Sequence, residues 1–292
     1  MPKLTKKVRA GAGALAVSAA TVIAPVVASA PAAHAATSNG GGGYWMVASD
    51  GGVFTFGHAG FYGSAASEHI TAPIVGMAAT PDGGGYWLVG QDGNVYAFGD
   101  AKDYGSLVGT RLNQPIVGIA STPNGGGYWL VASDGGVFAY GDAHFYGSTG
   151  GIKLNKPVVG IASSTDGGGY NLVASDGGVF SYGDAHFYGS TGGIKLNMPV
   201  VGMSSAPAGN GYWLVASDGG VFSFGPGSHF YGSTGGIKLN KPVVGLARSA
   251  DGGGYALVAS DGGIFNYGDE GFYGSLGNCI LNQPIVGAVA NG

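Results

Sequence analysis

The chain repeats one pattern along most of its length. Aligned on itself, it shows the pattern six times, at intervals of 42 residues except for a final interval of 43. The tyrosines that mark the same place in each repeat are Tyr44, Tyr86, Tyr128, Tyr170, Tyr212 and Tyr255. A repeat of this length is one supersecondary unit that buries its apolar faces against its neighbours. The sequence therefore predicts an array of six similar units.

Each repeat contains four segments typical of short strands. In the third repeat they are GYWLVAS from Gly127, GVFAYG from Gly136, HFYGS from His144 and PVVGIASS from Pro157. The sequence SDGG or QDGN joins the first two segments. It is typical of a tight turn, in which the Asp side chain caps the turn and Gly accepts positive φ. Four strands in one repeat predict a propeller blade, with PVVGIASS innermost because it alternates large and small residues. We expect the Tyr and Phe of FYGS to seal the outer blade.

The ends of the repeat region distinguish a ring from an open array. It begins in the middle of a repeat, at GGGGYWMVAS, and stops after PIVGAVANG. The last segment can therefore supply the strand that the first repeat lacks, whereas an open solenoid would need atypical capping repeats. We predict an all-β fold, a six-bladed β-propeller of four-stranded repeats over residues 36–292, closed by N- and C-terminal strands that share one blade.

Residues 1–35 have a different composition. Four basic residues precede an Ala/Val-rich run, and Ala33, His34 and Ala35 form a small-x-small cleavage pattern. We interpret this stretch as a secretory signal peptide cut after Ala35. A membrane anchor is the alternative, but Pro25 and Pro31 interrupt the run, so no membrane span is expected in the mature form. The predicted location is secreted or cell-wall associated.

Charge narrows the choice of partners. Residues 1–35 hold four of the twelve basic residues and none of the sixteen acidic ones, which leaves −8 on the mature chain. Nucleic acid and anionic lipid are therefore excluded as expected partners. Cys279 is the only cysteine, so no internal disulfide can form, and we expect a small buried side chain rather than a reactive thiol.

The repeats resemble a group of known sequences. GGGYWLVASDGGVFAYGDAHFYGS, followed by LNKPVVGIAS, is similar to tandem repeats of secreted and cell-wall-associated actinobacterial proteins, which stand alone or beside hydrolase and peptidoglycan-associated domains. The resemblance covers Gly40–Gly292 and implies no settled activity. VASDGGVFAYGDAHFYGS is also similar, more distantly, to the repeat of regulator-of-chromosome-condensation propellers, which implies a propeller but no function.

Catalytic motifs are lacking. The repeats differ in length by at most one residue, and the chain has no GxSxG elbow, His-x-x-x-His pair or phosphate loop. Recurrent Asp100, Asp142, Asp184 and Asp269 are replaced by His58 and Pro226 elsewhere, as loop-capping residues can be. We expect a non-enzymatic protein without cofactor or metal, with an exported hydrolase as one alternative.

Repeated aromatic and histidine positions are the candidate ligand-binding residues. Trp45, Trp87, Trp129 and Trp213 share one position, where Asn171 and Ala256 stand in the other two repeats. A site that accepts Trp, Asn and Ala is expected near a blade edge or face, where aromatic rings can stack on sugars. His144, His186 and His229 share another position, on separate blades, and cannot jointly bind one metal ion. An alternative for both sets is packing or surface decoration.

We therefore hypothesise a secreted, monomeric binding module that recognises cell-envelope or environmental glycans at several equivalent sites. The alternative partner is a secreted protein, for which the chain would be an interaction scaffold or a modulator of a secreted hydrolase.

Overall fold

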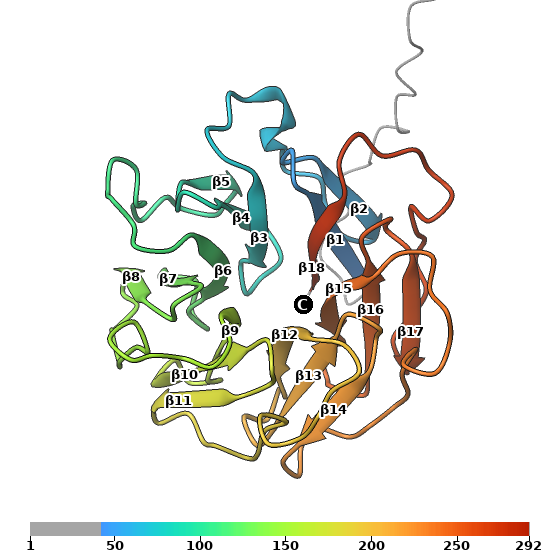
Figure 1. Ribbon diagram of the computed structural model, residues 1–292. Coiled ribbons are helices and arrows are strands. Elements are labelled where there is room, and N and C mark those ends of the chain that lie inside the picture. Colours follow the sequence, from blue (N-terminus) through green and yellow to red (C-terminus); the bar gives the residue numbers. More distant parts are fainter. Residues whose placement is uncertain (1–41, 292) are drawn as a thin grey trace, which may run out of the picture. The chain divides into compact units, whose positions relative to one another are not determined.

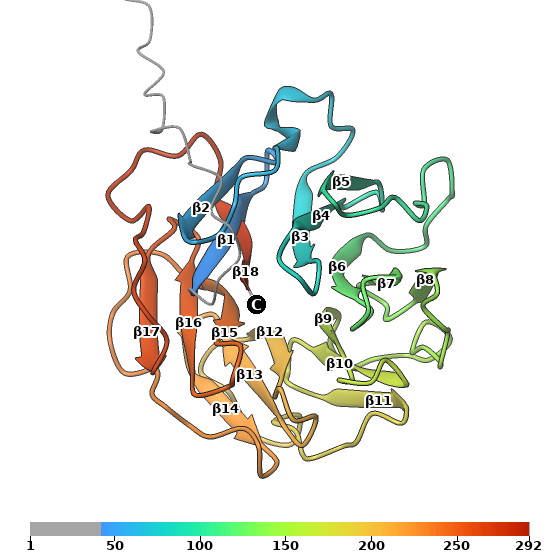
Figure 2. The same cartoon turned by 180° about the vertical axis from the view of Figure 1, so that it is seen from behind.

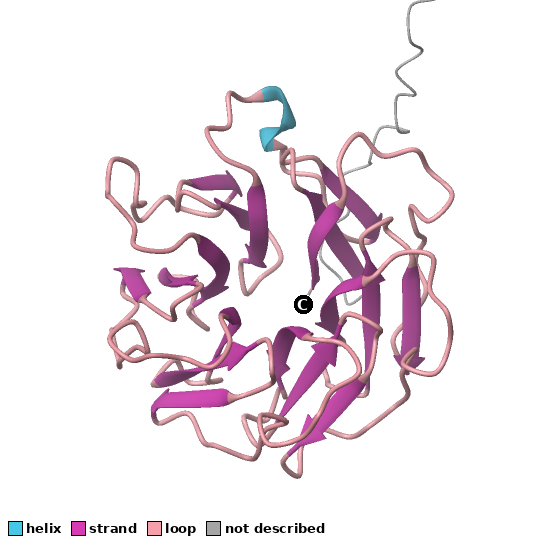
Figure 3. Cartoon of the chain, in the orientation of Figure 1, coloured by secondary structure: helices cyan, strands magenta, loops and turns pink. Residues whose placement is uncertain are grey.

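The computed structural model describes residues 42–291, so the predicted signal peptide, residues 1–35, lies outside the described residues. Within residues 42–291 there are 18 strands, grouped in six sheets of three, and one short 3-10 helix, η1, at Ala65–Ser67. We call the sheets blades 1 to 6, in the order of their middle strands along the chain. Figure 1 shows the blades arranged around a central axis, and Figure 3 shows that strands dominate.

Each blade has an inner, a middle and an outer strand that pair antiparallel. The inner strands of blades 1 to 6 are β18 (Ile285–Ala290), β3 (Ile74–Ala79), β6 (Ile116–Ser121), β9 (Val158–Ser163), β12 (Val200–Ser205) and β15 (Val243–Arg248). The middle strands are β1 (Gly43–Ala48), β4 (Gly85–Gly90), β7 (Gly127–Ala132), β10 (Gly169–Ala174), β13 (Tyr212–Ala216) and β16 (Gly254–Ala259). The outer strands are β2 (Val53–Gly57), β5 (Val95–Gly99), β8 (Val137–Gly141), β11 (Val179–Gly183), β14 (Val221–Phe224) and β17 (Ile264–Gly268).

The inner strands form the closed ring that the sequence predicts. Each inner strand contacts the inner strands of both neighbouring blades, and β18 contacts both β15 and β3. Close approach is possible because glycine lies in the middle of each inner strand: a Cβ added to Gly160 would lie 3.7 Å from the Cα of Gly202 in the next blade. The view from behind shows the same central arrangement (Figure 2). The placement of the PVVGIASS segment as the innermost strand is confirmed.

Blade 1 closes the ring by joining the two ends of the repeat region. β18, from the end of the chain, pairs with β1 from the first repeat, with Tyr44 opposite Ala290 and Val47 opposite Gly287. β1 then pairs with β2 on its other side. The predicted six-bladed propeller, closed by N- and C-terminal strands in one blade, is therefore confirmed.

The middle strands form the core. Their residues are buried throughout, as the burial of β7 and β10 illustrates. A blade is covered by a neighbour on both faces, so its middle strand has no face that can carry polar residues. The SDGG turns also fold as predicted, because the Asp134 carboxylate accepts a hydrogen bond from the Gly136 amide at 2.9 Å.

The prediction of a fourth strand in each blade needs correction. The segment HFYGS pairs with no strand in residues 42–291 and instead forms hydrogen bonds with the next blade. The hydroxyl of Tyr170 in blade 4 donates to the Gly147 carbonyl at 2.6 Å and accepts from the amides of Tyr146 and Gly147. These bonds use backbone groups that a fourth strand would have given to its ladder. The segment is an inter-blade connection rather than a strand.

Candidate binding site between blades 4 and 5

The four tryptophans do not form exposed platforms. Trp45, Trp87, Trp129 and Trp213 have no exposed surface, and Asn171 and Ala256 at the same position are also buried. The predicted position near an exposed blade edge or face is therefore wrong, and the side chains pack inside the blades instead. A sugar ring cannot stack on a side chain that no solvent reaches. The indole Nε1 of Trp129 instead donates to the backbone carbonyl of His144 at 2.7 Å. Trp213 makes the matching bond to His229 at 2.8 Å.

Two blades lack this tryptophan, and they differ in what replaces it. In blade 6, Ala256 lies opposite Asn266, whose Nδ2 donates to the carbonyl of Gly271 at 2.7 Å. That carbonyl belongs to the repeat position whose oxygen accepts from tryptophan in blade 3, so the hydrogen bond is preserved. In blade 4, Asn171 accepts a hydrogen bond from the Ser181 hydroxyl at 2.6 Å. No side chain of the described residues donates to the His186 carbonyl there.

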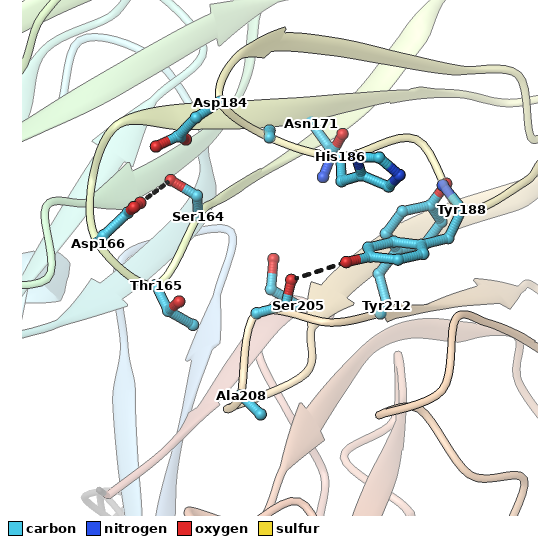
Figure 4. A pocket seen from close by; sticks show the side chains of 13 residues that line it. Ser164, Thr165, Asp166, Asn171, Asp184, His186, Tyr188, Ser205, Ala208 and Tyr212 are labelled. Carbon is cyan, nitrogen blue, oxygen red and sulfur yellow. Dashed lines mark hydrogen bonds between the residues drawn. The ribbon is translucent and has the colours of Figure 1, made fainter.

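A cavity lies beside Asn171, between blades 4 and 5. It has a volume of about 430 Å³, and we call it the blade 4–5 pocket. Its polar lining comes from two loops of blade 4 and one of blade 5 (Figure 4). These lining residues include Ser164, Thr165, Asp166, Asn171, Asp184, His186 and Ser205. The structure thus brings together two of the predicted ligand-binding residues, Asn171 and His186.

Two aspartates give the pocket a negative charge. The Ser164 hydroxyl donates to the Asp166 carboxylate at 2.8 Å, and the Gly168 amide donates to it at 3.1 Å. The Gly168 amide, the Ser164 hydroxyl and the nearby Asp184 carboxyl together hold the pKa of Asp166 below its usual value. Asp166 is therefore an anion at neutral pH, and its free lone pairs are available to a ligand.

A related cavity lies between blades 2 and 3. It measures about 390 Å³ and contains the corresponding pair of carboxylates, Asp82 and Asp100. Burial, followed by the charge of Asp82, raises the pKa of Asp100. Lys102 lines this cavity at the position that His186 occupies in blade 4, and Trp87 is retained in blade 2. The two cavities share one architecture, and these two side chains are among the differences between their linings.

The three histidines lie on the surface, as expected for surface residues. His144, His186 and His229 are exposed, each at the outer edge of its own blade and beside a tyrosine. The ring centroids of His186 and Tyr188 are 4.9 Å apart, closer than in the other two pairs. Among residues 42–291, no three His, Cys, Asp or Glu side chains come together as a metal site would require.

Exposed phenylalanines are the feature that the sequence reasoning missed. We expected the Phe of FYGS to be buried, but it is half or more exposed in five blades, where Asp103 replaces it in the other. These residues are Phe61 at 53%, Phe145 at 60%, Phe187 at 52%, Phe230 at 60% and Phe272 at 65%. The replacement by aspartate was the available signal, because a buried aromatic position rarely accepts a charge. The neighbouring tyrosine, by contrast, is only partly exposed and bonds to the next blade, as Tyr146 does to Gly167.

A second set of exposed apolar residues lies in the loops near the SDGG turns. Ile152, Ile194 and Ile237 are each 60% exposed, and each precedes a lysine. These loops are fixed by the turns, since the Thr149 hydroxyl donates to the Asp134 carbonyl at 3.0 Å. Cys279 is also exposed rather than buried as predicted, because its loop projects away from the core.

Comparison with known proteins supports the fold. No family model matches the chain, and no curated protein is similar to it at the sequence level. Among solved structures, the β-propeller domain of Cps50 (Swd1) from Myceliophteria thermophila is similar, with a TM-score of 0.54 and 13% sequence identity. The match covers 80% of this chain and 82% of that one. The chain is a β-propeller. No helix within residues 42–291 is long and apolar enough to cross a membrane.

Proposed function

We propose that the protein is a non-enzymatic, multivalent binding module that recognises saccharide chains through its outer edge. The observation that carries this proposal is the set of exposed phenylalanines at one position in five of the six blades. A ring with five equivalent apolar platforms can contact a polymer that repeats the same chemical group. Several weak contacts then combine into strong binding without a deep site.

The chemistry around each platform suits a sugar. A pyranose ring has an apolar C–H face that packs on an aromatic ring and hydroxyls that need polar partners. Phe145 is preceded in the chain by exposed His144, whose imidazole is a hydrogen-bonding group, and by exposed Asp142, whose carboxylate accepts from Thr122 and Asn124. The negative charge of the chain favours neutral or cationic polymers over anionic ones.

Export is part of the proposal. The basic and apolar stretch before Ala35, together with the resemblance to secreted actinobacterial repeats, supports a location outside the cell or in its wall. N-terminal sequencing of the protein recovered from culture supernatant or from the wall fraction tests this. The expected first residue is Ala36, and recovery only from the cytoplasm with an intact N-terminus would contradict export.

A binding screen with two matched variants tests the saccharide proposal. The mature protein is incubated with insoluble cellulose, chitin, xylan and isolated bacterial walls, and the bound fraction is measured. A triple variant, Phe145→Ser, Phe187→Ser and Phe230→Ser, is expected to lose most binding. The control variant, Ile152→Ser, Ile194→Ser and Ile237→Ser, changes equally exposed apolar residues of the same repeats and is expected to keep it. Binding that survives in the first triple variant would contradict the proposal.

A protein partner is the second candidate, and the exposed isoleucine loops favour it. An exposed apolar side chain such as Ile152 can be buried in the core of a protein interface, with the neighbouring Lys153 at its polar rim. Pull-down of secreted proteins with the same two triple variants tests this candidate. A stoichiometric partner lost with the isoleucine variant and kept with the phenylalanine variant would establish a scaffold role.

A further inference from the structure

The blade 4–5 pocket differs from the related blade 2–3 cavity because it has Asn171 and His186 where that cavity has Trp87 and Lys102. It lies where Asn171 replaces a tryptophan, and no neighbouring residue restores the missing contact as Asn266 does in blade 6. We propose that this pocket binds a single sugar ring, with preference for one that carries a free amino group. This inference rests on the saccharide class proposed above but uses different residues from the outer edge.

The size and shape of the pocket fit one ring. Its volume of about 430 Å³ lies within the range of roughly 300–1,000 Å³ that small-molecule sites occupy. The walls come from rigid positions: Tyr188 donates to the Gly209 carbonyl, and the Ser205 hydroxyl donates to the Ser163 carbonyl of the neighbouring blade. The close-up shows the Asn171, His186 and Tyr188 side chains on one side of the cavity and Asp166 on the other (Figure 4).

Asn171 provides a polar group that lacks a partner. Its side chain is 5% exposed, and its oxygen accepts from Ser181, but its Nδ2 donates to no residue within the described range 42–291. The Nδ2 atom is not fully buried, so it can donate to water or to a ligand in the pocket. Because Asn171 lines the pocket, a sugar hydroxyl placed there would supply the acceptor.

The carboxylates determine which sugar is preferred. Asp166 and Asp184 line the pocket, and its lining contains no Lys or Arg. The related blade 2–3 cavity has Lys102 at the corresponding place, which offsets the charge of its own aspartate pair. In the blade 4–5 pocket a ligand ammonium group can take that role. A carboxylate on the ligand would instead be repelled by both aspartates.

The first part of the test is direct binding of three probes of the same size. D-glucosamine, D-glucose and D-glucuronate are titrated into the mature protein and followed by ligand-observed NMR or calorimetry at neutral pH. We expect the dissociation constants to rise in that order, with at least a roughly tenfold gap between glucosamine and glucuronate. Equal affinity for all three probes, or binding of none, would overturn the proposal.

A substitution that removes the Asn171 amide from the pocket localises the binding. Asn171→Trp places a tryptophan opposite Ser181, the pairing that blade 5 already contains in Trp213 and Ser223. The variant is expected to fold with an unchanged or higher melting temperature and to lose glucosamine binding. Ala256→Trp, at the same position in blade 6, is the matched control and is expected to retain it.

Two further outcomes keep this proposal separate from the proposed function. Asp184→Asn is nearly isosteric and is expected to remove the preference for glucosamine over glucose, which also tests the site if Asn171→Trp fails to fold. Asn171→Trp is expected to bind polysaccharide through the outer edge as the parent does. If Asn171→Trp still binds glucosamine, the assignment of binding to the pocket is wrong, and the proposal for the outer edge is unaffected. The polysaccharide binding of the triple phenylalanine variant tests only the outer edge.

Discussion

Trp213 and Asn171 occupy the same repeat position in adjacent blades, and they show how one residue changes the space between blades. The sequence shows that the position tolerates Trp, Asn and Ala, and this tolerance by itself predicts exposure. The structure shows burial with two different adjustments: Asn266 restores the hydrogen bond in blade 6, and Ser181 donates to Asn171 beside the blade 4–5 pocket. Tolerance could not be interpreted from one position, because the compensating residue lies on the paired strand.

Glu270 gives a prediction about pH at the residue scale. Burial, with the charges of Asp269 and Asp251, raises the pKa of Glu270 to about 7 from its ordinary value of 4.5, and the Tyr44 phenol also faces it. The folded protein therefore holds this proton more tightly than the unfolded chain does. The free energy of unfolding is expected to fall as pH rises from about 4.5 to about 7, because the carboxylate becomes charged in a site that disfavours charge.

Replacing Glu270 by Gln tests this assignment. Glutamine removes the unfavourable charge of the carboxylate, so the variant is expected to be more stable than the parent at pH 8. The expected gain is only about 1 kcal/mol, because solvent screens the partly exposed group. Below about pH 4.5 the difference is expected to vanish, since the parent side chain is neutral in both states. Urea unfolding at several pH values measures it, and a constant difference at every pH would contradict the assignment.

At the scale of the element, the HFYGS segment shows which features of an element the residue pattern can predict and which it cannot. Alternating aromatics beside glycine indicated a short strand, and its place at the outer blade was correct. The sequence does not show that the hydroxyl of Tyr170, a residue of the next blade, takes the backbone groups of that segment. Gly147 is required there, since a Cβ at its φ of 140° would lie 2.4 Å from the Tyr182 ring.

The hydrogen bonds of Tyr170 between blades predict that Tyr170→Phe lowers the free energy of unfolding more than Tyr96→Phe does. Tyr170→Phe removes a hydroxyl with three hydrogen bonds and leaves the Gly147 carbonyl without its donor. It is expected to destabilise the protein by about 1–3 kcal/mol. Tyr96→Phe is the control, because the Tyr96 hydroxyl is buried without a partner in residues 42–291 and phenylalanine stands at this position in every other repeat.

Chemical denaturation of the two variants measures this difference. Tyr96→Phe is expected to leave stability unchanged or raise it, since it removes an unsatisfied buried hydroxyl. Equal losses in both variants would show that the connection between blades does not depend on the Tyr170 hydroxyl.

At the scale of the whole molecule, closure was predictable and the binding surface was not. The offset between the chain ends and the repeat boundaries indicated that β18 joins β1, and the structure has that pairing. The exposure of Phe145 and the cavity beside Asn171 depend on how neighbouring blades meet, which the pattern within one repeat does not contain. Repeat position therefore identified His186 and Asn171 as candidates without indicating that they share a pocket.

Closure predicts a large effect from a small truncation. Ending the chain at Pro284 removes β18, including fully buried Ile285, and leaves blade 1 without its inner strand. The melting temperature is expected to fall by about 10 °C or more, because the ring loses contacts on both sides of the removed strand. Adding the peptide 285–292 in trans is expected to recover part of the loss. An unchanged melting temperature would contradict closure by β18.

The most direct test of the multivalent outer edge uses the polysaccharide that binds the protein best in the screen. Its dissociation constant is measured as the exposed phenylalanines are replaced by serine one at a time. Five equivalent platforms predict a stepwise loss of affinity, by a similar factor at each of Phe61, Phe145, Phe187, Phe230 and Phe272, whatever the order. The melting temperature is expected to stay constant, because these side chains are exposed. Affinity that survives all five substitutions, or that disappears with one particular phenylalanine, would contradict recognition by a ring of equivalent sites.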